Sequence, residues 1–95
     1  MSGSSFEIGQ VLQSQKIANM RADCEDFTAE VYAALEKYKR MDWGETCEKD
    51  KPLNDEAARQ SGGMILAKYE TSKGAIVIKT DQDRLHTKIQ TFEEY

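Results

Sequence analysis

The sequence contains a single histidine, His86, and this scarcity narrows the catalytic chemistry that the chain can carry. Any nucleophilic triad would have to use His86 as its base. The alternating segment around it predicts a strand in which His86 faces solvent, on the opposite face from Thr87 and Ile89. The sequence has no nucleophile elbow, phosphate-binding loop, dinucleotide fingerprint or HExxH motif. We therefore predict that the protein is not an enzyme.

Cysteine is also scarce, and this limits metal chemistry. Cys24 and Cys47 form no CxxC motif, and with one histidine they make a poor set of ligands for zinc, which takes four. We expect no metal and no cofactor. No segment has the long apolar core of a signal peptide or a membrane span. These features predict a cytoplasmic protein whose two thiols are reduced.

The chain has no excess of positive charge. Seventeen acidic residues against thirteen basic ones give a net charge of -4, whereas binding to nucleic acid phosphates needs clustered lysine and arginine. We therefore expect a protein partner and no direct binding to nucleic acid. The acids concentrate in residues 41 to 60, where three bases oppose Asp42, Glu45, Glu48, Asp50, Asp55 and Glu56. This acidic middle could imitate DNA toward a basic partner, although such runs are more often solvated helix surface.

The length of 95 residues predicts one domain, because chains divide into several only well above this size. Residues 1–5 are small and polar, which predicts a disordered tail, and residues 6–95 then form a single domain. The segment from Phe6 to Leu12 predicts a short strand or an extended lead-in with a break at Gly9.

Three segments have helical patterns. Ser14 can cap a short helical turn that runs through Ile17 and Met20. A longer helix follows Asp23 and Asp26, either of which can cap it. The spacing of its apolar residues predicts one stripe that faces the core, formed by Phe27, Val31, Leu35 and Tyr38.

A further helix is predicted over residues 52–60, because Pro52 suits a first helical turn. Leu53 and Ala57 are its expected inward residues, and Gly62 with Gly63 would end it.

The pattern then changes to that of strands. Two apolar runs, residues 63–71 and 74–80, are joined by a segment whose glycine favours a hairpin. A third segment alternates Leu85, Thr87, Ile89 and Thr91 on one face. The predicted fold class is α+β, with a three-stranded antiparallel meander packed against two or three helices.

The only tryptophan lies between an acid and a glycine, in Asp42-Trp43-Gly44. The stretch falls between two predicted helices, so Trp43 can fold back over the seam between helices and sheet while Gly44 adopts a positive φ. Asp42 can form a local hydrogen bond. A buried position in the core is the favoured interpretation, and an exposed contact for a partner is the alternative.

Several marks in fixed order resemble a family of short bacterial proteins carried on plasmids, integrative elements and prophages. The resemblance extends from about residue 8 to the last residue. The marks are Asp42-Trp43-Gly44, Asp50, Asn54 with Ala57, Gly63 before a strand, Thr80 with Asp83-Arg84, Thr87, and Glu93-Glu94-Tyr95.

The resemblance implies a setting in a bacterial host cell. Many small proteins of mobile elements bind CRISPR or restriction complexes, so we expect an inhibitor of a host defence complex that acts by protein binding. The alternatives are an accessory factor that binds a plasmid replication or transfer protein, and a small hydrolase or ligand binder that uses Asp83, Arg84 and Thr87. The expected partner-binding residues are the six acids of the acidic middle together with Trp43, Asp83, Arg84, Glu93, Glu94 and Tyr95.

Overall fold

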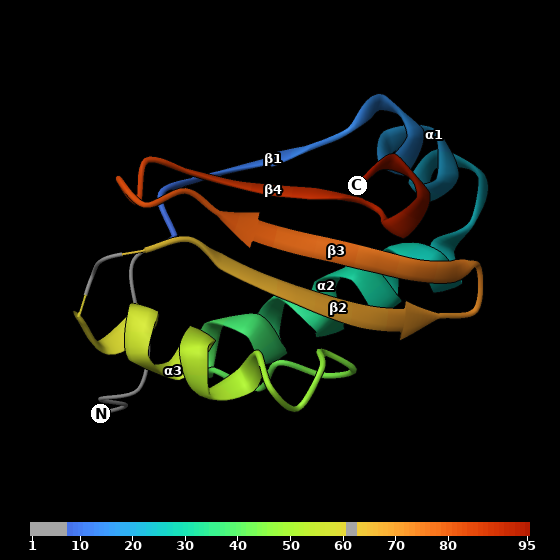
Figure 1. Ribbon diagram of the computed structural model, residues 1–95. Helices are drawn as coiled ribbons and strands as arrows, with labels where there is room; N and C mark the ends of the chain where they lie inside the picture. Colours follow the sequence, from blue (N-terminus) through green and yellow to red (C-terminus); the bar gives the residue numbers. More distant parts are fainter. Residues whose placement is uncertain (1–7, 61–62) are drawn as a thin grey trace.

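A computed structural model describes residues 8–60 and 63–95 and has the predicted α+β class (Figure 1). The predicted tail of residues 1–5, Phe6 and Gly62 lie outside the described residues. The elements, in chain order, are strand β1 (Gln10–Gln13), helices α1 (Gln15–Asp23), α2 (Glu25–Lys39) and α3 (Lys51–Gln60), strands β2 (Ile65–Thr71), β3 (Gly74–Thr80) and β4 (His86–Thr91), and the 3-10 helix η1 (Phe92–Glu94).

The sheet has four strands in the order β1-β4-β3-β2, so the predicted three-stranded meander is incomplete. Strands β2, β3 and β4 do form an antiparallel meander. Strand β1 adds to it in parallel beside β4, with Val11 opposite Thr87. Parallel strands are joined by a long crossover and not by a tight turn, so no turn residues in the sequence mark β1 and β4 as neighbours. The sequence therefore predicted an extended segment before Ser14 but did not predict which strand it pairs with.

Helix α2 covers the inner face of the sheet, and Figure 1 shows α3 beside β2 at one edge. The predicted stripe of α2 is confirmed, since Phe27, Val31 and Tyr38 are fully buried and Leu35 packs partly against them. On the sheet, alternate residues of the strands face this stripe. They are Ile65, Ala67, Tyr69, Ile76, Ile78 and Ile89.

The helix starts agree with the sequence in one case and differ in another. Ser14 caps α1, as predicted, and its hydroxyl accepts a hydrogen bond from the backbone N–H of Ile17 at 3.2 Å. Helix α2 is capped by neither Asp23 nor Asp26, because α1 continues through Asp23 and the extended residue between the two helices is Cys24. The acids of the first turn of α2 still face the positive end of its dipole.

Two apolar residues predicted to face inward are exposed. Leu53 is exposed, and α3 turns Asn54 and Ala58 inward because the Asn54 amide bonds to the backbone of β2. Leu85 is exposed because Arg84 adopts a positive φ of 62° and strand β4 begins only at His86, after Leu85. The exposed position predicted for His86 is confirmed.

A chain of buried hydroxyl groups joins α2 to the sheet and to the segment before β1. The hydroxyls of Tyr38 and Thr80 lie 2.6 Å apart, those of Thr80 and Thr87 lie 2.7 Å apart, and Thr87 donates to the carbonyl of Ile8 at 2.6 Å. A carbonyl only accepts, so the protons are ordered from Tyr38 to Thr80, from Thr80 to Thr87, and from Thr87 to Ile8. Burial raises the pKa of Tyr38, which keeps its phenol protonated in this chain.

Replacing Thr80 with valine removes the middle of this chain without a change in volume. We expect Thr80→Val to lower the free energy of unfolding by about 1 to 3 kcal/mol, because buried hydroxyls on both sides lose a partner. Urea denaturation followed by circular dichroism measures this loss. Thr71→Val is the matched control, since the hydroxyl of Thr71 bonds at an exposed hairpin. Equal stability of the two variants would contradict the role of the buried chain.

Candidate functional site

The free edge of strand β2 is closed by residues 43–54, here called the edge segment. Leu66, Lys68 and Glu70 direct their backbone groups away from β3, and most of these groups have partners in the edge segment. Asn54 donates to the carbonyl of Leu66 at 2.8 Å and accepts from its N–H at 3.4 Å. Because the exposed edge of a sheet is a template for pairing with another chain, this arrangement blocks pairing at β2.

The middle of the same edge is closed by Glu45 and Thr46. The N–H of Glu45 donates to the carbonyl of Lys68 at 2.9 Å, and the N–H of Lys68 donates to the hydroxyl of Thr46 at 2.9 Å. The N–H of Glu70 donates to the carboxylate of Glu45 at 2.9 Å. One carboxylate of the acidic middle is therefore engaged in closing the sheet edge.

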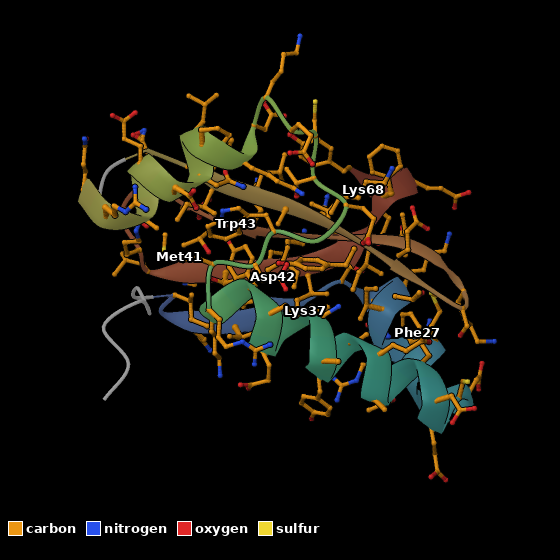
Figure 2. All side chains as sticks on the ribbon, turned by 90° about the horizontal axis from the view of Figure 1, so that it is seen from below. Phe27, Lys37, Met41, Asp42, Trp43 and Lys68 are labelled. Atoms are coloured by element: carbon orange, nitrogen blue, oxygen red, sulfur yellow. The ribbon has the colours of Figure 1, made fainter. Side chains whose placement is uncertain are left out.

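Trp43 is buried, with 3% of its surface exposed, so the predicted position in the core is confirmed. Figure 2 shows it between α2 and α3. Its indole N–H donates to Asp55 at 2.8 Å, and its ring meets Tyr38 edge to face at a centroid distance of 5.5 Å. Gly44 has a φ of 60°, and a Cβ there would lie 2.5 Å from the Tyr69 ring. The chain can pass this close to β2 only with glycine at this position.

Asp42 forms the predicted local bond, since its carboxylate accepts from the N–H of Gly44 at 3.1 Å. Its carbonyl also accepts from the hydroxyl of Tyr69 at 2.7 Å. Burial raises the pKa of that phenol, so Tyr69 stays a donor. The Asp42-Trp43-Gly44 stretch is thus accounted for by its contacts within the fold.

The residues of the hydrolase alternative lie near one another, and two of them are buried. Arg84 donates to the carbonyls of Ala57, Gly63 and Asp81 at 2.7, 2.8 and 3.1 Å. It thereby joins the last turn of α3, where a cation opposes the helix dipole, to the turn before β4. The Thr87 hydroxyl belongs to the buried chain, and the Asp83 carboxylate accepts from the N–H of Leu85.

Several acids of the acidic middle are engaged in contacts within the fold. Asp42, Glu45 and Asp55 make the contacts described above. Glu48 is exposed and pairs with Lys51 at 3.0 Å, and Glu56 lies on α3 beside Gln60. The six acids therefore extend from Asp42, just before the edge segment, to Glu56 in the middle of α3.

A groove on the outer face of the sheet brings several predicted residues together. This outer groove has a volume of about 310 Å³. Glu45, Asp50 and Tyr95 are the members that the sequence predicted for partner binding. The full lining comprises Glu45, Thr46, Cys47, Asp50, Leu66, Ala67, Lys68, Val77, Phe92 and Tyr95.

Two exposed aromatic residues stand at this groove. Phe92 is 50% exposed and Tyr95 is 58% exposed, while Val77 beneath them is 2% exposed. The ammonium of Lys68 lies 4.6 Å from the centroid of the Phe92 ring and 3.9 Å from the Glu70 carboxylate. Phe92 is absent from the predicted binding residues. The signal for it was the alternation of β4, which places the residue after Thr91 on the solvent face.

The last turn of the chain is held in place by Glu94. Its carboxylate accepts from the N–H of Thr91 and the hydroxyl of Ser14, both at 2.8 Å, and completes a capping box with Thr91. These hydrogen bonds stabilise the charged carboxylate and so lower the pKa of Glu94, the bond from the Thr91 N–H most strongly and that from Ser14 next. Glu93 pairs with Lys16 at 3.0 Å. Glu94 therefore fixes η1, and Glu93 adds an exposed ion pair to α1. Phe92 begins this turn and Tyr95 directly follows it.

Comparison with known proteins identifies no relative. No protein-family model matches the chain, and neither the curated proteins nor the solved structures include a match. The resemblance to mobile-element proteins stays a prediction. Within residues 8–60 and 63–95, no helix combines the length and apolar character that crossing a bilayer requires. The same residues contain no cluster of three or more side chains suited to hold a metal ion.

Trp43→Ala tests the account of the edge segment. We expect a loss of about 3 to 5 kcal/mol in the free energy of unfolding, because the substitution leaves a cavity and removes the partner of Asp55. Thermal or urea denaturation measures it. Leu53→Ala, which truncates an exposed side chain on α3, should change stability by less than about 0.5 kcal/mol. A Trp43→Ala protein as stable as the Leu53→Ala control would show that Trp43 is no part of the core.

Proposed function

We propose that this chain is a protein-binding module without catalytic activity, and that it binds its partner through the outer groove. The observation that carries the proposal is the pair of half-exposed aromatic side chains, Phe92 and Tyr95, over an apolar floor that includes Val77. Aromatic residues are enriched among the positions that dominate binding energy at protein interfaces. The lining of the groove offers a surface for contact, and it does not combine an acid, a base and a nucleophile as a catalytic site would.

The rim of the groove selects the chemistry of the partner. Glu45 and Asp50 line it, and Lys68 is already engaged by the Phe92 ring and Glu70. An apolar side chain flanked by lysine or arginine suits such a site, because the apolar part covers the floor and the cation meets the acidic rim. Truncation of one well-packed aromatic contact at an interface costs about 2 kcal/mol or more.

The setting of the proposal comes from the resemblance to mobile-element proteins. We propose that the partner belongs to a host defence complex of the CRISPR or restriction type, whose nucleic-acid-binding surfaces carry the basic residues that the acidic rim would meet. A plasmid replication or transfer protein would present similar chemistry, so the assay must separate the two partners. The contacts disfavour the hydrolase alternative, because the Arg84 and Thr87 donors are directed to backbone carbonyls.

The test is a challenge assay in bacteria that express the protein. Cells with an active CRISPR or restriction system should admit more of a targeted phage or plasmid when the wild-type chain is present. Phe92→Ala combined with Tyr95→Ala should restore interference, because the groove loses its aromatic contacts. Leu53→Ala is the matched control, since it removes an equally exposed apolar side chain outside the groove.

Two results would contradict the proposal in different ways. Full interference with the wild-type chain present, across all host-matched systems, would remove the defence complex as the partner. Inhibition by the double variant equal to that of the wild type would remove the outer groove as the binding site. Circular dichroism and urea denaturation of the double variant establish that its fold is intact.

A further inference from the structure

The opposite edge of the sheet is formed by β1 (Figure 1), and among residues 8–60 and 63–95 nothing closes it as the edge segment closes β2. The N–H of Gln10 donates to the carbonyl of Leu85, and that of Ser14 donates to the carbonyl of Ile89, both at 2.9 Å. Because strand residues alternate, the backbone groups of Val11 and Gln13 point away from β4. Within the described residues, no other segment bonds to these outward groups. They are available to a further strand.

A groove runs under this edge on the side of the helices. It has a volume of about 320 Å³ and lies between β1 and α2. Val11 and Gln13 line it from the strand, while Tyr32 and Leu35 line it from α2. Tyr32 is 56% exposed. A strand added beside β1 would place every second side chain over this apolar surface.

The surroundings of the edge carry unpaired positive charge, although the chain as a whole is acidic. The Arg21 guanidinium, which lines the groove, donates only to neutral oxygens: the Gln13 side chain at 2.6 Å and the Tyr32 hydroxyl at 2.9 Å. Its Nε is buried without a hydrogen-bond partner. On the other face, Lys88 lies directly opposite Lys79, in register with Leu12 of β1. Among the described residues none of these three cations forms an ion pair.

We propose that the β1 edge binds an extended, acidic segment of a partner protein as an added antiparallel strand. The outward backbone groups of Val11 and Gln13 supply the ladder, and alternate side chains of the segment lie over Tyr32 and Leu35. Acidic side chains meet Arg21 on the inner face and Lys88 on the outer face. This second surface is separate from the outer groove, whose rim is acidic and lies across β2 and β3.

Charge favours this occupant over a second copy of the chain. Pairing of two β1 edges would bring Arg21, Lys79 and Lys88 of both copies together, whereas each copy brings one carboxylate, Asp81, to the hollow that Leu12 and the two lysines line. Such juxtaposed like charges disfavour association. The acidic segment instead provides the carboxylates that these cations lack, and its extended backbone fits the four residues of β1.

The test uses a short, capped peptide with glutamate at every outer-face position and, on the inner face, valines plus one glutamate placed to meet Arg21. A peptide with lysine in place of each glutamate is its control. In an NMR titration the acidic peptide should shift the amide signals of Val11 and Gln13 and slow their exchange with solvent. Val11→Pro removes an outward N–H and leaves the bonds to β4, so it should abolish these effects. Arg21→Gln combined with Lys88→Gln should weaken binding roughly tenfold through loss of charge pairing. If Val11→Pro fails to fold, the affinity of this double variant for the acidic peptide tests the proposal in its place.

Several outcomes would overturn the proposal. Equal binding of the lysine peptide would remove the charge argument, and unchanged affinity in a folded Val11→Pro variant would remove the strand addition. A concentration-dependent dimer that Val11→Pro disrupts would assign the edge to a second copy. The variant with Phe92→Ala and Tyr95→Ala should bind the acidic peptide normally, so failure at the β1 edge and failure at the outer groove are distinguishable.

Discussion

The position of β2 at the edge of the sheet is the constraint on which the arrangement of this small protein depends. Leu66, Lys68 and Glu70 direct backbone donors and acceptors out of the sheet, and an unpaired edge invites pairing with another chain. The edge segment supplies a backbone pair and three side chains in place of a fifth strand. Trp43 anchors this segment in the core, where its ring packs against Tyr38. Gly44 lets it approach β2.

This closure determines which surfaces are left for binding. It engages the carboxylate of Glu45, and it places Glu45 and Asp50 at the rim of the outer groove. The opposite wall is built by η1, which Thr91 and Glu94 hold against β3. The candidate site is therefore a product of two short non-strand segments, each fixed by side-chain bonds to backbone.

The sequence predicted those elements whose signals are local. The stripe from Phe27 to Tyr38, the cap at Ser14 and the β2-β3 hairpin follow from periodicity and from residue preferences over a few positions. The pairing of β1 with β4 could not be predicted in this way, because the two strands are far apart in the chain.

Tertiary contacts also overrode local patterns within single elements. An apolar Leu53 is exposed and a polar Asn54 faces inward, since the amide closes the sheet edge and a leucine cannot. Arg84 resembled a surface or catalytic residue, yet it binds the carbonyls at the end of α3. Of the predicted binding residues, Glu45, Asp50 and Tyr95 meet at one groove. Phe92, beside them, was missed although the alternation of β4, continued by one residue, places it on the same face.

The central claim is that, within the described part of the chain, the β2 edge of the sheet is closed by the edge segment and the β1 edge is open. Residue-resolved amide hydrogen exchange tests it most directly, with the N–H of Lys68 compared with that of Val11 after correction for intrinsic rates. The N–H of Lys68 donates to the Thr46 hydroxyl, so we expect it to exchange at least roughly tenfold more slowly than that of Val11. Equal exchange at the two positions, or faster exchange at Lys68, would contradict the account.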